Sequence, residues 1–146
     1  MIAALGSAAT WPLAARAQQA VMPVIGFISA GSPEAYPQAL AAFRKALNDI
    51  GFVEGQNLAI EYRWAGTEYE RFPSLAADLV HRQVSVIAVL GSTPGTLAAK
   101  AATTTIPIVF GIGGDPVALG LVASLNRPGG NMTGVTLLNV AAMSKR

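Results

Sequence analysis

Cysteine is absent from this sequence. Without thiols the chain cannot carry a disulfide framework, a zinc site built on thiolates or a cysteine nucleophile. It also offers no cysteine for lipid attachment, so we expect no lipid anchor. Several large classes of extracellular scaffold, metalloprotein and thiol enzyme are therefore excluded before any motif is considered.

Charged residues are also scarce, at 12% of the chain against 52% hydrophobic residues. Intrinsic disorder needs the opposite balance, so this composition predicts a folded domain. Lysine and arginine are scattered and the net charge is only +2, which leaves no basic run to follow a phosphate backbone. We therefore expect no nucleic acid among the partners of this chain.

Histidine occurs once, as His81, beside Arg82 near the end of an expected helix. We interpret it as a solvated side chain favoured by the negative end of the helix dipole. When parallel strands alternate with helices, the C-terminal ends of the helices lie at the edge of the sheet opposite to the C-terminal ends of the strands. His81 is therefore badly placed for catalysis at the strand ends, and we expect neither a catalytic residue nor a metal site.

The first residues resemble a targeting segment rather than part of the fold. Residues 1–14 are small, apolar and uncharged, and Ala15-Arg16-Ala17 then fits a signal peptidase site with cleavage before Gln18. The segment is too short to cross a bilayer as a helix, and it lacks the positive start typical of leaders. We expect residues 1–17 to be a signal peptide and residues 18–138 to form the folded lobe; the alternative is an apolar helix packed on that lobe.

Short apolar runs alternate with segments of helical periodicity, which is the pattern of a parallel sheet. The runs predict strands at residues 24–30, 58–64, 84–90, 106–111 and 133–138. Helices are predicted from Ser32-Pro33 to a glycine cap at Gly51, and over residues 69–82, 95–103 and 117–125. Because such crossovers are right-handed, the order predicts an α/β fold: a doubly wound parallel sheet of about five strands, flavodoxin-like, with helices on both faces.

Polar caps followed by proline stand after three of the expected strands, at Ser32-Pro33, Thr93-Pro94 and Asp115-Pro116. The carboxyl ends of parallel strands meet at one edge of the sheet, where ligands bind. Helix starts present free N–H groups and partial positive charge, which suit a carboxylate or another anion. Each of these residues taken alone is better explained as an ordinary helix cap. We predict a ligand site only because all three are expected at the same edge of the sheet.

Several residues near this edge allow two interpretations. Tyr36 can stack on a ligand or belong to the apolar stripe of its helix, whereas we assign Phe27 to the core. Asp115 can accept a hydrogen bond from a ligand, or it can cap the helix before Pro116. The glycine-rich run 111–114 fails the dinucleotide pattern, because Pro116 stands where the third glycine belongs, so we expect no cofactor.

Sequence blocks spread over nearly the whole chain resemble one protein family. The longest reads FRKALNDIGFVEGQNLAIEYRWA, and another reads RPGGNMTGV. The blocks follow in order at residues 11–19, 43–65, 75–80, 98–109, 115–117 and 127–135. On them the chain resembles the substrate-binding proteins of ABC transporters, whose leaders often begin with a twin-arginine segment that is absent here. The resemblance implies a soluble periplasmic protein with two α/β lobes, which holds a solute between them and works with an ABC permease.

The resemblance also implies where the solute lies. The loops at residues 30–32, 91–94 and 111–115 would face the cleft between the lobes. The candidate ligand-binding residues are therefore Ala30, Gly31, Ser32, Tyr36, Gly91, Ser92, Thr93, Gly113 and Asp115. The solute would be an amino acid or another small carboxylate. Residues 139–146 would begin the crossover to a second lobe, so this chain would be a truncated single lobe and not an enzyme.

Other interpretations share the same sheet pattern, because a fold does not fix a function. One is a stand-alone flavodoxin-like domain, acting as an enzyme or as a receiver module. A receiver needs an acidic cluster at the strand ends, which residues 24–30 lack, and Asp115 is nearly alone as a titratable group there. Another is a non-functional gene fragment. For a lone lobe, the exposed face and the last strand near the sheet edge also favour self-association.

Overall fold

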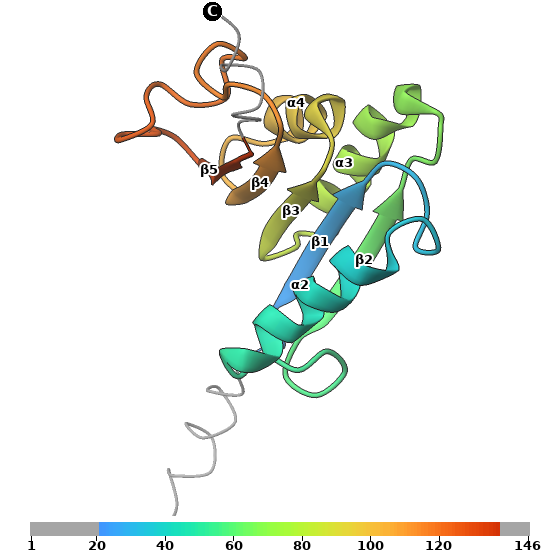
Figure 1. Cartoon of the computed structure of the whole chain (residues 1–146). Coiled ribbons are helices and arrows are strands. Elements are labelled where there is room, and N and C mark those ends of the chain that lie inside the picture. Colours follow the sequence, from blue (N-terminus) through green and yellow to red (C-terminus); the bar gives the residue numbers. More distant parts are fainter. Residues whose placement is uncertain (1–20, 138–146) are drawn as a thin grey trace, which may run out of the picture.

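Strands and helices alternate along residues 21–137, the part of the chain that the computed structural model describes (Figure 1). The strands are β1 (Val24–Ser29), β2 (Ala59–Trp64), β3 (Val86–Leu90), β4 (Ile108–Ile112) and β5 (Met132–Thr136). The helices are α2 (Pro37–Asp49), the short 3-10 helix η1 (Tyr69–Arg71), α3 (Phe72–His81) and α4 (Thr93–Ala102). The expected signal peptide at residues 1–17, the expected crossover at residues 139–146 and residue 138 of the fifth predicted strand lie outside the described residues.

All strand pairs in the sheet are parallel, and the order across it is β2-β1-β3-β4-β5. The chain moves from β1 outward to β2, then crosses back to β3 and continues to β4 and β5. The direction of winding therefore reverses between β1 and β3, where the loops that leave these two strands turn to opposite faces. The predicted doubly wound sheet is confirmed, and its topological switch point lies between β1 and β3.

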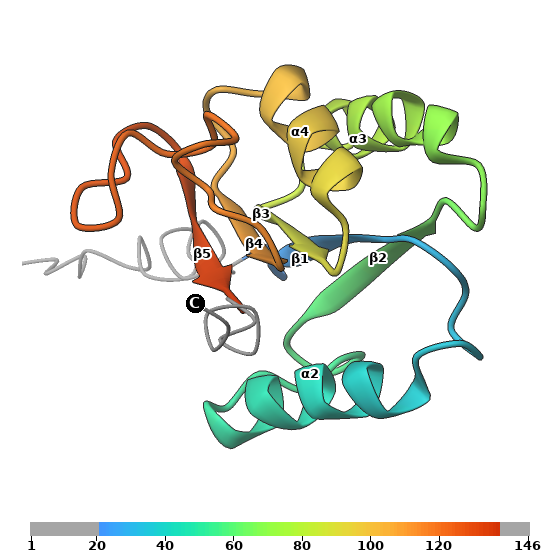
Figure 2. The same ribbon diagram turned by 45° about the horizontal axis from the view of Figure 1, so that its top comes forward.

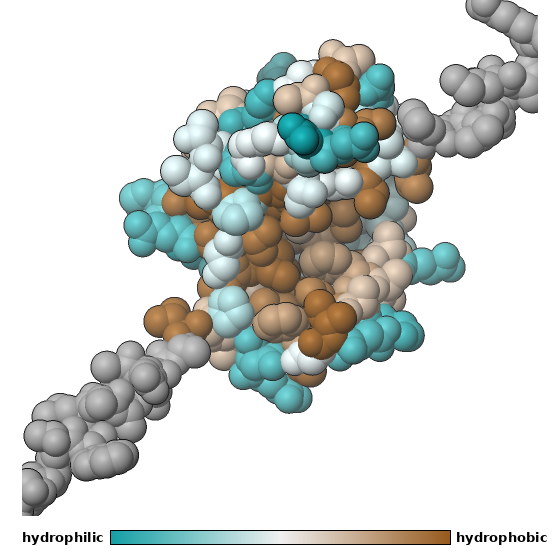
Figure 3. Space-filling view, turned by 90° about the vertical axis from the view of Figure 1, so that its left-hand side faces the viewer, coloured by the Kyte–Doolittle hydropathy of each residue, from teal (hydrophilic) through white to brown (hydrophobic). Residues whose placement is uncertain are grey.

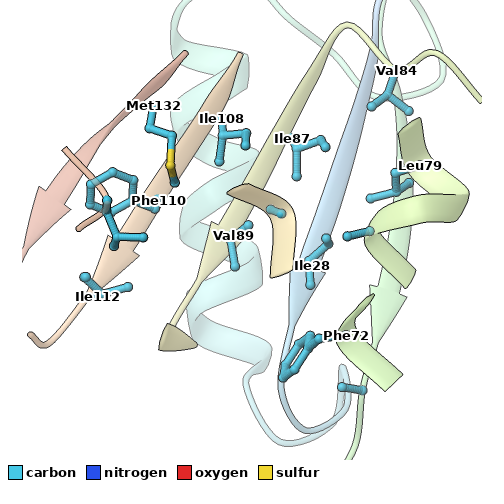
Figure 4. Packing of buried hydrophobic residues seen from close by; sticks show 14 of the residues in the cluster. Ile28, Phe72, Leu79, Val84, Ile87, Val89, Ile108, Phe110, Ile112 and Met132 are labelled. Carbon is cyan, nitrogen blue, oxygen red and sulfur yellow. The ribbon is translucent and has the colours of Figure 1, made fainter. Parts of the chain in front are cut away.

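Helices lie on both faces of this sheet, with α2 on one face and α3 and α4 on the other (Figure 2). Because side chains alternate along a strand, β1 directs Phe27 toward α2 and Ile28 toward α3 and α4. The larger apolar cluster lies on the side of α3 and α4, where Phe72 and Leu79 are fully buried (Figure 4). A Cβ atom at Gly26 would lie 2.7 Å from Leu79 Cδ1, so the glycine in β1 allows α3 to pack closely on the sheet.

The start of α2 differs from the sequence prediction. We expected the helix to begin at Ser32-Pro33, but it begins at Pro37. Residues 33–35 form a turn instead, in which the Ala35 N–H donates to the Ser32 carbonyl at 3.1 Å. Both prolines suit a first helical turn, because the fixed φ of proline is already helical there. Ser32 therefore does not cap α2, and Tyr36 occupies the N-cap position without a side-chain hydrogen bond.

The end of α2 confirms the predicted glycine cap. Gly51 has φ of +94°, a left-handed conformation that side chains disfavour. Its N–H donates to the Asn48 carbonyl at 3.0 Å, and the Phe52 N–H donates to the Leu47 carbonyl at 2.9 Å. This pair of bonds is the Schellman arrangement, which satisfies the last carbonyls of the helix.

The predicted helix over residues 117–125 is wrong, because these residues form turns. One helical turn closes where the Leu119 N–H donates to the Asp115 carbonyl at 3.0 Å. Gly120 then adopts φ of +68° and ends the turn, and the Leu121 N–H donates to the Pro116 carbonyl at 2.9 Å.

Within residues 21–137, no helix has the length and apolar character needed to cross a membrane.

Candidate functional site

A hollow of about 130 Å³ lies at the carboxyl ends of β1, β2 and β3, and so at the switch point of the sheet. The strand ends and α2 supply its walls. The lining residues are Phe27, Ser29, Ala30, Tyr36, Ala39, Leu40, Trp64, Leu90 and Gly91. We call this space the first hollow. It is lined mainly by apolar atoms, and it lies where ligands bind in open parallel sheets.

Aromatic rings give the first hollow its shape. Phe27 is 3% exposed, and its ring centroid lies 5.4 Å from that of Trp64 and 5.3 Å from that of Phe43. The Trp64 ring is nearly parallel to that of Tyr62, at 6.5 Å between centroids. These tilted and offset arrangements are the favourable ones for aromatic pairs. Phe27 is confirmed as a core residue, and it lines the hollow as well.

A second hollow adjoins the first along the same edge of the sheet and shares Leu90 and Gly91 with it. Its volume is about 330 Å³. The loops after β3 and β4 and the end of β5 line it. The lining residues are Leu90, Gly91, Ser92, Thr93, Gly111, Ile112, Gly113, Val135 and Leu137. The two hollows therefore extend from the switch point toward β5. Seen from the side on which β5 lies, the surface is hollowed and apolar at its middle, with hydrophilic residues around it (Figure 3).

The start of α4 points into this second hollow, and its backbone is already largely hydrogen-bonded. Ser92, which is 5% exposed, caps the helix: its Oγ accepts from the Gly95 N–H at 3.0 Å. The Ser92 carbonyl accepts from the Thr96 N–H at 3.0 Å and from Thr96 Oγ1 at 2.8 Å. Pro94 has no N–H to offer. The helix therefore presents its partial positive charge and the Thr93 side chain, rather than a row of free donors.

The residues predicted for the site divide into three groups. Ala30, Tyr36 and Gly91 line the first hollow, and Gly91, Ser92, Thr93 and Gly113 line the second. Gly31 and Ser32 lie in the loop between β1 and α2, outside both linings. Asp115 is used locally, because its Oδ1 accepts from the N–H groups of Val117 at 2.9 Å and Ala118 at 3.3 Å.

The loop residue Ser32 also has a local partner. Its hydroxyl donates to the Glu34 carboxylate and, with a backbone hydrogen bond, lowers the pKa of that carboxyl. Of the three predicted caps, only Asp115 has a capping role, and it caps a single turn rather than the helix we expected. Ser32 lies before the turn that precedes α2, and the N-cap of α4 is Ser92 rather than the predicted Thr93.

Sequence reasoning missed Trp64, the most substantial wall of the first hollow on the side of β2. The sequence pattern predicts Trp64 at the end of a strand, where the structure has it, but the site was predicted only from strands that are followed by a cap and a proline. After β2 the chain continues as Ala65-Gly66-Thr67, without that signal. The aromatic alternation of Tyr62 and Trp64 was the available clue, because it places two rings on the face that carries Phe27.

Charged side chains lie away from both hollows. Among the described residues, none that lines either hollow is charged. The main ion-pair cluster joins β2 to α3: Arg63 Nη2 lies 2.7 Å from Asp78 Oδ2 and 2.8 Å from Glu61 Oε2. Within residues 21–137, no group of three acidic or histidine side chains could hold a metal ion. The arrangement can therefore enclose an apolar group and present helix-end charge beside it.

Comparisons with known proteins identify the family of this chain. The family model for ABC transporter substrate-binding proteins matches residues 22–146. The "Tyrosine-binding protein" of Clostridioides difficile is 38% identical over 99 residues, which are 68% of this chain and 28% of that protein. The chain thus spans well under half the length of that relative.

Solved structures show the same sheet. A ligand-free, open substrate-binding protein from Clostridium difficile is 32% identical with a TM-score of 0.71, over 78% of this chain and 38% of that one. An ABC domain from Streptococcus pneumonia, in complex with L-Trp, has a TM-score of 0.71 over 80% of this chain and 39% of that one. It is 22% identical and supports the fold alone. Because the family model matches residues 22–146 and a related sequence is 38% identical over 68% of the chain, this chain belongs to the ABC transporter substrate-binding proteins.

Proposed function

We propose that this chain captures a small organic solute for an ABC import system, at the carboxyl edge of its parallel sheet. The observation that carries the proposal is the apolar, aromatic-walled hollow at the switch point between β1 and β3. Ligand sites of open α/β sheets lie at this point for a geometric reason, since the loops diverge there and leave a crevice. The fold alone would not name the function, whereas the site at this edge supports solute binding.

The first hollow suits an apolar group of modest size. Phe27, Trp64 and Leu40 offer surfaces without charge, and a dry apolar cavity of about 150 Å³ is known to hold benzene. A hollow of about 130 Å³ therefore fits a branched aliphatic group or a single ring. The related protein named for tyrosine binding supports a ring-bearing amino acid as one candidate solute.

The second hollow suits the polar end of such a solute. A carboxylate placed beside Thr93 would lie at the positive end of the α4 dipole, which favours anions near the first helical turn. The Thr93 hydroxyl can donate one hydrogen bond to it. Because the two hollows share Leu90 and Gly91, one small carboxylate can occupy both.

The proposed site is half of a cleft. A bound amino acid carries two charges, and burying an unpaired charge is costly, yet no charged side chain among the described residues lines either hollow. We propose that a further lobe supplies the missing partners and closes over the solute, as hinge closure does in two-lobe binding proteins. On this proposal residues 1–17 direct export, the working protein is periplasmic, it delivers solute to a permease, and it performs no catalysis.

We also propose that the chain, as it stands, self-associates. On the α2 side of β4 and β5, Val109 is 41% exposed and Val135 is 66% exposed, and β5 is an edge strand. An apolar face beside an open edge favours contact between copies. Sedimentation at rising concentration tests this: we expect dimers or larger species, reduced by Val135→Lys. A monomer at all concentrations would contradict it.

A thermal-shift panel tests the proposed function. We expect a free amino acid with an apolar side chain to raise the midpoint of unfolding, because a ligand at about ten times its Kd stabilises by about 1.4 kcal/mol. The Trp64→Ala variant should lose this response while glycine, as a solute without a side chain, should have little effect on either protein. If no amino acid or small carboxylate stabilises the chain, the proposed solute class is wrong.

A further inference from the structure

The loops that follow β1 and β2 are fastened to each other by two glycines. The Gly31 N–H donates to the Gly66 carbonyl at 3.0 Å, and the Gly66 N–H donates to the Gly31 carbonyl at 3.1 Å. Both residues have left-handed backbones, with φ of +76° at Gly31 and +64° at Gly66. We call this reciprocal pair the glycine clasp. It joins the two loops just beyond the first hollow, where the strand ladder between β1 and β2 has ended.

The Tyr36 ring lies directly against this clasp. A Cβ atom at position 31 would lie 2.8 Å from Tyr36 Cε2, closer than side chains pack, so the ring occupies the space that the glycine leaves free. The Tyr36 backbone is held as well, since Pro37 follows it and its carbonyl accepts from the Leu40 N–H at 3.1 Å. Tyr36 is 52% exposed and lines the first hollow. It is therefore an outer wall of the hollow rather than a core residue.

We propose that Tyr36 is the specificity-determining wall of the first hollow and that the glycine clasp is the positioning element that holds its ring there. This inference rests on the proposed function, because it concerns which solutes the hollow accepts. With the ring against Gly31, the hollow of about 130 Å³ accepts one ring or a branched chain. A two-ring side chain is larger and enters only if Tyr36 moves outward.

The chain offers a matched control for the clasp. Gly55 has φ of +84°, so Gly55→Ala imposes the same kind of backbone strain as Gly31→Ala, but a Cβ atom there meets nothing within 4 Å. Gly31→Ala adds the collision with the Tyr36 ring to that strain. Comparing the two variants therefore separates the ring contact from the general cost of replacing a left-handed glycine.

The experiment measures solute affinity by NMR titration, with L-tyrosine as the one-ring probe and L-tryptophan as the two-ring probe. We expect wild type and Gly55→Ala to prefer L-tyrosine. In Gly31→Ala and in Tyr36→Ala the preference should shift toward L-tryptophan by about tenfold, which corresponds to about 1.4 kcal/mol of lost wall contact. If Gly31→Ala does not fold, the comparison of Tyr36→Ala with wild type is the test of the inference.

Hydrogen exchange at the Gly66 amide gives a second measurement that needs no solute. We expect slow exchange in wild type and Gly55→Ala, and faster exchange in Gly31→Ala, because the clasp is disturbed. An unchanged tyrosine-to-tryptophan ratio in Tyr36→Ala, or Gly31→Ala matching Gly55→Ala in both measurements, overturns the inference. If wild type binds neither amino acid, the inference about Tyr36 is overturned, whereas the proposed function is overturned only if the whole panel of amino acids and small carboxylates fails to bind.

Discussion

At the scale of single residues, the residues at the sheet edge have two different roles. Some line the hollows, and others form hydrogen bonds with the nearby backbone. Ala30, Tyr36 and Gly91 are free to line the first hollow, whereas the Asp115 carboxylate is engaged by two backbone N–H groups. Ser92 belongs to both groups, because it lines the second hollow while its Oγ caps α4. A polar residue at a strand end is therefore a candidate ligand contact only after its local hydrogen bonds are known.

Ser92→Ala tests the cap directly. We expect it to lower the free energy of unfolding by about 1 kcal/mol, since an N-cap hydroxyl is lost and the buried Gly95 N–H loses its partner. The measurement is urea unfolding, and Ser74→Ala is the control, because the exposed Ser74 hydroxyl only donates to the Arg71 carbonyl. Equal stability of Ser92→Ala and wild type would show that the cap contributes nothing.

The same residues show what the sequence could predict about the site and what it could not. The edge was predictable, because strand ends are local signals. The capping residues were predictable only in part, since Asp115 caps a turn, whereas Ser92 rather than Thr93 caps α4 and Ser32 does not cap α2. Trp64 was not identified, since its place on the hollow depends on how β2 pairs with β1 and on which face each side chain takes. Pro33 and Pro37 are equivalent as sequence signals, and the turn at residues 33–35 selects the second as the start of α2.

At the scale of elements, β5 pairs with β4 through a position where only glycine fits. A Cβ atom at Gly134 would collide with the Phe110 carbonyl oxygen and would lie 2.7 Å from the Phe110 ring. Gly134→Ala should therefore lower the free energy of unfolding by about 1–3 kcal/mol, as overpacking does elsewhere, or separate β5 from the sheet. Urea unfolding measures this, with Gly113→Ala as control because a Cβ atom there meets nothing within 4 Å. Similar loss in the two variants would contradict the close approach.

The ion pair between Arg63 in β2 and Asp78 in α3 should make the stability of the fold depend on pH. The Arg63 hydrogen bond lowers the pKa of the Asp78 carboxyl below its ordinary value of 3.8. Because the folded value is depressed, the contribution is complete above the ordinary value and is lost as the pH falls through the folded one. The stability difference between wild type and Asp78→Asn should therefore shrink in acid, as measured by urea unfolding across pH. A difference that stays constant into strong acid would exclude this role for Asp78.

The order of elements was largely predictable, whereas one helix was not. Apolar runs alternating with amphipathic segments specify a parallel sheet, and each strand was placed to within about two residues, the usual uncertainty of such boundaries. Residues 117–125 have helix-forming composition, but Gly120 in a left-handed conformation and the bond from Leu121 to Pro116 end the helix after one turn. Composition favours a helix without revealing which glycine will end it.

At the scale of the whole molecule, the sheet places its two hollows side by side at one edge. The surface seen from the side of β5 is apolar at its middle (Figure 3). The chain spans 28–39% of the similar proteins described above. If a further lobe supplies the other contacts, as proposed above, the described residues alone should bind a solute weakly, because every 1.4 kcal/mol of lost contact costs about a factor of ten in affinity. The site is therefore best studied by a method that detects weak binding residue by residue.

The most direct test of the account is an NMR titration of the labelled chain with the apolar amino acid that stabilises it most. The account predicts that amide shifts concentrate at the switch-point edge. The residues expected to move are Ala30, Tyr36, Trp64, Gly91, Ser92 and Thr93. Saturable shifts confined instead to the glycine-rich loop at residues 128–131, on the opposite edge of the sheet, would contradict it. So would a complete absence of saturable shifts with every amino acid and small carboxylate tested.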